Sequence, residues 1–390
     1  MRVKNLSNRL QLFPVLCLLL FYSCSRQRST IRDEEQIETI TVSVNEMNNS
    51  IPWYSILDSI SFIKLETDKD CAISNIRRII VHDDHFYIHD FMNHRILVFN
   101  SKGKFISKIE KRGAGPGEYL DLRDFTIDDE FIYILTYNRI LKYAFNGNYI
   151  EDIRIPELPE FFSPLQFMKY DNTFYFWRGA FGAQKINREK FSLIKTDLKM
   201  NVLETKFPII GEFANSKKFT RHDENYYLTY NWGNDTIYEL SKFIRAKYYI
   251  DFGEDKLDEK DIPEGFGTVR RNFFTDLINT NKCGNISDVF EDKNIVYFTF
   301  HKNNHLFHSI FIKENQTLYT GKLGLSQPIS PLIIQGKVQD KYYSILESFI
   351  VKGFLDKYYD SNSSYKFLKE LLDVDYDDNP VIMLFKFNNV

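Results

Sequence analysis

The sequence is poor in cysteine, glycine and net charge, and each shortage excludes a class of protein. It has 4 cysteines and 17 glycines in 390 residues, and 50 basic residues nearly balance 53 acidic ones. The absence of a Gly-X-Y period excludes collagen. A formal charge of −3 argues against a nucleic-acid-binding protein, which needs a basic face to neutralise phosphates. With 43% hydrophobic residues, the chain is not disordered over long stretches.

What the sequence has in excess is aromatic residues, with 35 Phe, 24 Tyr and 3 Trp. Together with many β-branched residues, this composition favours sheet over a helix bundle. At about 150 residues per domain the length predicts two or three domains, but all-β folds often exceed that size as one unit.

Residues 1–23 are predicted to be a signal peptide, with three basic residues, no acid and an apolar run over 10–22. That run is shorter than the ~20 residues of a membrane span. It ends at Ser23-Cys24, which resembles the lipobox of bacterial lipoproteins, where the cysteine is acylated. The alternative is an ordinary secretory signal cut nearby, with Cys24 free or removed.

Residues 24–58 are polar and weakly patterned, and we expect them to be a tether between membrane and fold. Residues 59–390 form the predicted single domain. The expected location is the cell envelope, as an outer-membrane lipoprotein. No acidic cluster follows Cys24, and by resemblance to the export signals of bacterial lipoproteins this gives no support for surface display, so the periplasmic side is the expectation.

A unit of two polar turn residues, an aromatic strand and a second strand recurs six times. The units begin near residues 83, 128, 171, 223, 292 and 340. A spacing of roughly 40 to 50 residues is typical of β-propeller blades. The sequence therefore predicts an all-β fold, a six-bladed β-propeller, which the strand at 61–66 closes by pairing with the last blade.

Two insertions interrupt the repeat, at 256–283 and 349–373, and both have apolar residues at helical spacing. We expect amphipathic helices that cover an edge of the propeller or an end of its channel. The alternative is a face on which a partner docks.

Several motifs carry a family resemblance. Residues 87–90, 93–96 and 103–105 are similar to the NHL-type repeat. A further set resembles the six-bladed β-propeller lipoproteins of Bacteroides-type bacteria: Leu65-Glu66-Thr67, 113–119, 234–238 and Asn379-Pro380-Val381. This resemblance implies a fold and an envelope location, and it transfers no catalytic residue.

No catalytic, metal or cofactor site is predicted. The loop 113–119 lacks G-x-G-x-x-G spacing and precedes a strand, so it is an inter-blade loop and not a phosphate cradle. His82, His85, His89 and His94 lie close in sequence, but the strand and turns between them keep them from converging on zinc. A second group contains His301, His305 and His308. Catalytic groups from distant blades remain an alternative that spacing does not exclude.

Cys71 and Cys283 are the cysteines of the predicted domain. An oxidising envelope permits a disulfide between them. Two unpaired thiols are the alternative, because sequence does not show whether the Cα atoms come within reach.

A ligand-binding rim is predicted from aromatic and charged residues beside turns. Its members are Trp177, Arg178, Trp232, Arg95, Arg123, Asp124 and Tyr119. Rings next to hydrogen-bonding groups suit stacking on a sugar face, and loops on a rigid scaffold are common binding positions. Edge packing is the alternative for each residue.

We therefore expect a non-catalytic, lipid-anchored propeller that binds a ligand or protein partner. Glycan acquisition is a setting implied by the resemblance alone. The expected partners are the membrane, through the anchor, and a carbohydrate or an envelope protein, but no nucleic acid. The alternatives are a polysaccharide hydrolase or lyase and a structural scaffold of an envelope complex.

Overall fold

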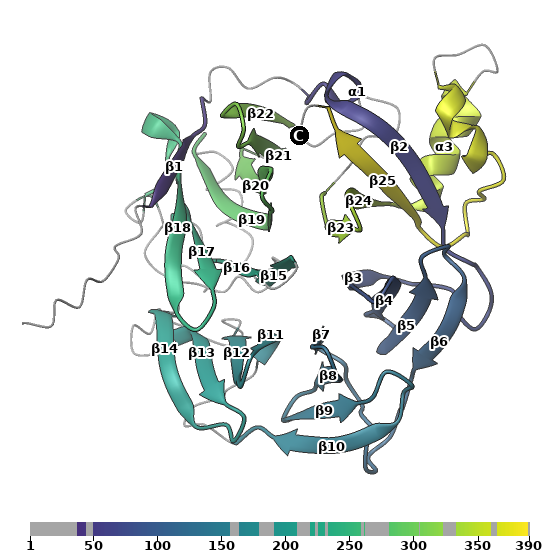
Figure 1. Cartoon of the computed structure of the whole chain (residues 1–390), viewed down its shortest axis with the longest axis vertical. Coiled ribbons are helices and arrows are strands. Elements are labelled where there is room, and N and C mark those ends of the chain that lie inside the picture. The colour runs from purple at the N-terminus through teal and green to yellow at the C-terminus, as the bar shows by residue number, and fades with distance from the viewer. Residues whose placement is uncertain are drawn as a thin grey trace, which may run out of the picture. The chain divides into compact units, whose positions relative to one another are not determined.

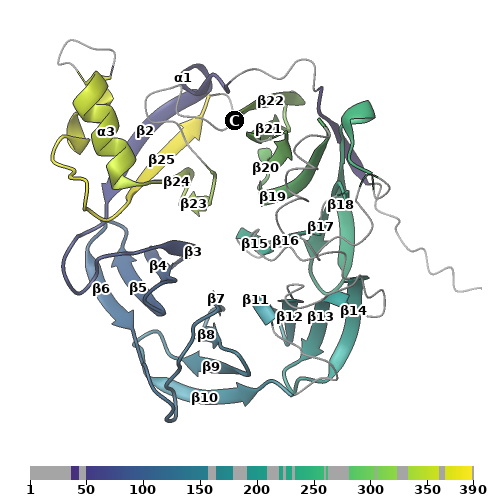
Figure 2. The same ribbon diagram turned by 180° about the vertical axis from the view of Figure 1, so that it is seen from behind.

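A computed structural model describes residues 37–43, 50–156, 164–178, 191–208, 219–222, 225–230, 233–258, 261, 281–303, 305–322, 333–359 and 365–388. Within the unit Ile37–Val390, six sheets are arranged in a ring about a common axis (Figures 1 and 2). The predicted six-bladed β-propeller is confirmed.

The blades follow one another along the chain, each with its first strand innermost. Blade 1 contains β3 (Ile76–His82), β4 (His85–Asp90), β5 (Arg95–Asn100) and β6 (Phe105–Ile109). Blade 2 contains β7 (Asp124–Ile127), β8 (Ile132–Leu135), β9 (Arg139–Tyr143) and β10 (Tyr149–Arg154). Blade 3 contains β11 (Pro164–Tyr170), β12 (Thr173–Arg178), β13 (Phe191–Asp197) and β14 (Val202–Pro208).

The second half of the ring includes the two blades that recruit N-terminal chain. Blade 4 contains β15 (Phe219–His222), β16 (Asn225–Thr229), β17 (Thr236–Leu240), β18 (Ile244–Asp251) and β1 (Glu38–Thr41). Blade 5 contains β19 (Cys283–Glu291), β20 (Ile295–Lys302), β21 (His305–Ile312) and β22 (Thr317–Lys322). Blade 6 contains β23 (Gly336–Val338), β24 (Lys341–Leu346), β25 (Val381–Phe387) and β2 (Leu57–Lys64).

Aspartate side chains shape the tight turns between the two inner strands of a blade. Asp128 accepts hydrogen bonds from the backbone amides of Glu130 and Phe131, at 2.9 and 2.8 Å. Asp292 does the same at the corresponding turn of blade 5. Such side-chain bonds replace the ladder bonds that the backbone loses at a turn, which explains the polar residues at these two turns.

The aromatic excess lies mainly between the blades. At the junction of blades 2 and 3, Phe167, Phe174 and Phe176 are buried with ring centroids 6.0 to 6.2 Å apart. Aromatic pairs at this spacing stabilise a core beyond the area they bury. The interpretation of most aromatic residues as blade-to-blade core is confirmed.

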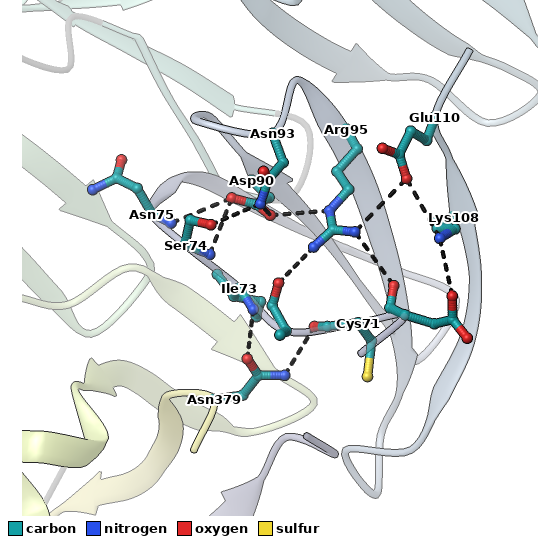
Figure 3. A network of polar contacts seen from close by, with 12 residues as sticks. Cys71, Ile73, Ser74, Asn75, Asp90, Asn93, Arg95, Lys108, Glu110 and Asn379 are labelled. Carbon is teal, nitrogen blue, oxygen red and sulfur yellow. Dashed lines mark hydrogen bonds and ion pairs between the residues drawn. The ribbon is translucent and has the colours of Figure 1, made fainter. Parts of the chain in front are cut away.

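The ring closes where β2 pairs antiparallel with β25, as the strand predicted at 61–66 required. Asn379, which precedes β25, reinforces this closure from the side. Its amide accepts from the backbone of Ile73 at 2.7 Å and donates to the carbonyl of Cys71 at 3.0 Å (Figure 3). It also donates to the carbonyl of Glu66 at 2.7 Å. N- and C-terminal segments are thus joined both by a strand pair and by one buried side chain.

The prediction of a tether over 24–58 is wrong for the part that the structure describes. Strand β1 pairs parallel with β18 and buries Ile40. A short helix, α1 (Trp53–Ile56), buries Trp53 against blades 5 and 6. A four-residue edge strand has only one or two inward side chains. That is too few for hydrophobic periodicity to indicate the strand in the sequence.

The second predicted insertion is helical and lies outside the ring beside blade 6 (Figure 1). Its elements are α3 (Ser348–Tyr358) and the 3-10 helix η4 (Lys366–Leu371). Val351, Leu355 and Leu368 are buried in one core with strands of that blade, so the helices cover a propeller edge. The first insertion, at 256–283, lies mostly outside the described residues, and η2 (Gly253–Asp255) directly precedes it. Within the described ranges, no helix is long and apolar enough to span a membrane.

Candidate functional site: the central channel

A cavity of about 440 Å³ lies at the centre of the ring. It is lined by the innermost strands β3, β7, β11 and β15 and by the segment around β23, with rings contributed by Tyr226 and Tyr343. Five of the six blades therefore face one cavity, which is the arrangement that makes a propeller axis a common binding position.

One wall of the cavity is built on an ion pair between Arg78 of β3 and Asp124 of β7, at 3.0 Å. Arg78 also donates to the carbonyls of Phe125 and Phe167, at 3.0 and 3.4 Å. Asp124 accepts from the backbone amide of Phe167 at 2.9 Å. Burial raises the pKa of Asp124, although Arg78 opposes that shift. Since these groups belong to blades 1, 2 and 3, the pair fixes three blades to one another.

The other two cations of the lining have partners as well. Arg221 of β15 donates to the backbone carbonyl of Ile127 in blade 2, and its guanidinium carbon lies 5.6 Å from the centroid of the Tyr226 ring. Lys337 forms an ion pair with Asp292 of the preceding blade. Each of these three cations therefore has a partner in another blade, a carboxylate for Arg78 and Lys337 and a backbone carbonyl for Arg221.

The rest of the lining contains one exposed carboxylate, that of Asp83 in the turn after β3, and several neutral polar groups. Gln339 is exposed in the turn between β23 and β24 and has a φ of 55°. Thr126 of β7 contributes a hydroxyl, and the Tyr343 ring lies so close to Gly336 that a Cβ there would approach it to 2.9 Å. These groups make a cavity suited to an uncharged polar molecule with one apolar side.

The predicted rim is wrong for its aromatic members that the structure describes. Trp177 is 2% exposed and packs edge-on against Phe219 and Tyr230. Tyr119 is 1% exposed, and its hydroxyl donates to the carbonyl of Ile109 at 3.0 Å. A ring buried on both faces has none free for a sugar, so both side chains act in packing. Trp232 lies outside the described residues.

Arg95 and Asp124 are also buried and paired, which contradicts their predicted place on a rim. Arg95 donates to Asp90 at 3.0 Å and to the carbonyl of Ala72 at 2.5 Å, and Glu110 lies 3.7 Å away (Figure 3). These contacts fasten the loop between β2 and β3 to blade 1. Asp124 holds Arg78 at the channel, as described above.

Arg123 and Arg178 are half-buried. Arg123 donates to Asp121 at 2.8 Å, and its guanidinium carbon lies 4.8 Å from the Tyr137 ring centroid. Arg178 ends β12 in blade 3. Binding roles for these two remain predictions, and neither lines the channel cavity.

A disulfide between Cys71 and Cys283 is the wrong alternative, because both are buried free thiols in different cores. Cys71 lies between blades 6 and 1, and Cys283 lies between blades 4 and 5. Burial raises the pKa of Cys283 to about 12, which keeps its thiol protonated and unreactive.

The described residues contain no group of three histidine, cysteine or acidic side chains placed to hold a metal ion. His82 stacks on Phe145 with centroids 4.8 Å apart. His89 is buried inside blade 1, where burial and the neighbouring arginines lower its pKa to about 3.

Sequence reasoning missed the arginines of the channel. Arg78 directly precedes the apolar residues 79–81 of β3, and Arg221 follows Phe219 and Thr220 in β15. A charged side chain in such a strand needs a buried partner, and this could have identified both as inward-facing.

The family model for a domain of unknown function, DUF4934, matches residues 37–386. The chain is similar to the solved structure of a putative exported protein from Bacteroides fragilis, with 19% identity and a TM-score of 0.71, covering 91% of this chain and 100% of that one. It is also similar to a DUF4221-family member from Bacteroides vulgatus, with 11% identity and a TM-score of 0.53, over 88% and 99% of the two chains. None of the curated proteins matches it. The likeness to the solved structures shows the fold. Because the family model covers nearly the whole propeller, the chain belongs to the DUF4934 family.

Proposed function

We propose that this protein is an exported, membrane-anchored binding protein whose ligand is a short neutral saccharide held in the central channel. One observation carries the proposal: a cavity of about 440 Å³ whose cations are all partnered. A charged ligand would have to compete with these partners. A neutral one needs only the amide, hydroxyl and aromatic groups of the lining, the combination found in small-molecule sites.

The ligand class is tested by calorimetric titration of the purified protein with neutral mono-, di- and trisaccharides. Gln339→Gly removes the amide and keeps a residue that accepts a positive φ, so we expect at least a tenfold weaker Kd, about 1.4 kcal/mol. Gln316→Gly is the matched control, because Gln316 is exposed, has a φ of 54° and lies in an outer turn of blade 5. Equal affinity in both variants would refute the channel site.

The same mixtures are analysed for products over several hours. Binding without release of shorter or unsaturated sugars supports a binding protein. Turnover would replace this proposal by a propeller hydrolase or lyase. Reproducible in-cell crosslinks to envelope proteins, with no saccharide bound by the purified protein, would instead identify a scaffold.

The export and anchoring part rests on Ser23-Cys24 behind the apolar run, and on the solved relative that is named an exported protein. Two or more acyl chains hold a protein at a membrane where one does not. Cys24→Ala should move the protein from the membrane to the soluble fraction. Protease treatment of intact cells distinguishes the periplasmic side, where the protein stays protected, from the surface.

A further inference from the structure

A second cavity, of about 430 Å³, lies on blade 2 and shares no lining residue with the channel. One wall is the inter-blade loop 113–119. The other walls are the turn between β8 and β9, at 136–138, and the ends of β9 and β10. This cavity contains the glycine-rich segment that sequence analysis singled out and that the channel does not use.

The loop wall is held rigidly. Gly117 has a φ of +72°, and a Cβ there would come within 2.6 Å of the Tyr149 ring. Glu118 accepts from the amide of Gly115 at 2.9 Å, and its own carbonyl accepts from Arg139 at 2.7 Å. These bonds fix a backbone wall before any ligand arrives, which lowers the entropy cost of binding.

Tyr137 provides a supported aromatic surface at the cavity mouth. Its side chain is 56% exposed. Asp121 accepts from the Tyr137 amide at 3.3 Å and from Arg123 at 2.8 Å, and the Arg123 guanidinium lies over the ring at 4.8 Å. The ring is therefore held in place without being buried, and Leu120 beside it is 76% exposed.

Two arginines face each other at the base of the same cavity. Arg139 of β9 and Arg154 of β10 are directly paired in the antiparallel register, so their side chains share one face of the sheet. Like charges in this position repel and cost stability. Asp152, which also lines the cavity, forms an ion pair with Arg139 at 3.8 Å, and its other oxygen accepts the Tyr149 hydroxyl at 2.6 Å.

Among the described residues no hydrogen bond or ion pair holds the exposed guanidinium of Arg154. The channel arginines, in contrast, have partners. Arg139 and Arg154 thus repel each other beside a preformed cavity. Unfavourable arrangements of this kind are expected mainly at functional sites. An anionic group placed between the two guanidinium groups would relieve it.

We propose that this cavity is a second binding site, for a saccharide that carries a carboxylate. The carboxylate lies between Arg139 and Arg154, and the apolar face of the sugar ring rests against Tyr137 and Leu120. The exposed side-chain amide of Asn138 accepts hydrogen bonds from ring hydroxyls and donates hydrogen bonds to them. This site is independent of the neutral-ligand site in the channel.

The proposal is tested with trigalacturonate and its methyl ester, in which each negatively charged carboxylate is replaced by a neutral methyl ester. Calorimetry with the purified protein at low salt should show trigalacturonate binding at least tenfold tighter than the ester. Arg154→Gln and Tyr137→Ala should each weaken trigalacturonate binding tenfold or more. Both side chains are exposed, so neither substitution should lower the melting temperature, and Arg154→Gln should raise it slightly by removing the repulsion from Arg139.

Two matched substitutions serve as controls. Arg245→Gln changes an exposed arginine of blade 4, and Tyr358→Ala changes a 51% exposed tyrosine of α3. Both controls should bind trigalacturonate like the wild type, and so should Gln339→Gly in the channel. Equal affinity for acid and ester, equal loss in the controls, or tighter binding of an oligoglutamate peptide than of the saccharide would overturn the proposal.

Discussion

Asn379 should contribute more to stability than an exposed residue of its type, because its side chain is buried and makes several hydrogen bonds across the closure of the ring. The side chain is 3% exposed and makes three hydrogen bonds to backbone groups of the loop between β2 and β3. Asn379→Ala removes all three while leaving the strand pair of β2 and β25 intact.

The expected loss follows from those bonds. A net hydrogen bond is worth about 1 kcal/mol, and a buried group left without a partner costs about 1 to 3 kcal/mol. Ile73 loses an acceptor, and the carbonyls of Glu66 and Cys71 lose a donor. We therefore expect the free energy of unfolding to fall by about 3 kcal/mol. At about 2.1 cal/mol/K per residue for the unfolding entropy, a ring of this size loses roughly 4 °C in Tm.

Urea denaturation followed by tryptophan fluorescence measures this change. The midpoint should fall while the slope stays constant, since the surface exposed on unfolding is unchanged. Asn388→Ala is the control, because that exposed amide makes one bond of 2.9 Å, to the carbonyl of Ser55. We expect it to cost less than 1 kcal/mol. A loss below 1 kcal/mol for Asn379→Ala, or the same loss in both variants, would refute the role of Asn379 in ring closure.

Three further predictions concern buried titratable groups. Burial raises the pKa of Asp235 from 3.8 to about 7, and neither carboxylate oxygen accepts a hydrogen bond. The native state therefore holds this proton more tightly than the unfolded chain. The free energy of unfolding should fall by roughly 3 kcal/mol between pH 5 and pH 8. In urea titrations at the two pH values, Asp235→Asn should abolish that loss. Cys71 and Cys283 should react with a thiol reagent only after unfolding, and an intact mass lower by two hydrogen atoms would reveal the disulfide instead. Arg78→Met should cost about 3 to 5 kcal/mol by leaving Asp124 charged and buried, and adding Asp124→Asn should recover part of that stability; no recovery would contradict a charge effect.

The fold was predictable because each blade has a local sequence pattern that repeats. The polar pair at 128–129 and the aromatic strand after it recur with little change around the ring, and the closing strand at 61–66 was found as the one strand left over. Residues 37–43 escaped prediction because a short parallel edge strand carries almost no periodicity. Its place in blade 4 depends on β18, about two hundred residues away, and no local pattern encodes that partner.

The candidate sites were much less predictable, since residue type does not tell which face of a strand is covered. Trp177 and Tyr119 looked available because turns flank them, yet both fill spaces between blades. Tyr137 stands at a comparable turn and is exposed. The difference lies in what the neighbouring blade places opposite each ring, and that is a property of the closed ring rather than of the local sequence.

The two cavities are similar in residue composition and differ in the partners of their arginines. Both contain two arginines and at least one tyrosine. In the channel, Arg78 and Arg221 bind groups of other blades, so their charge serves the assembly of the ring and leaves neutral chemistry for a ligand. On blade 2, Arg139 and Arg154 repel each other within one sheet, and the ring gains nothing from that repulsion. Salt should consequently have little effect on ligand binding in the channel and should weaken binding at the blade 2 cavity, where the attraction is an exposed one between full charges.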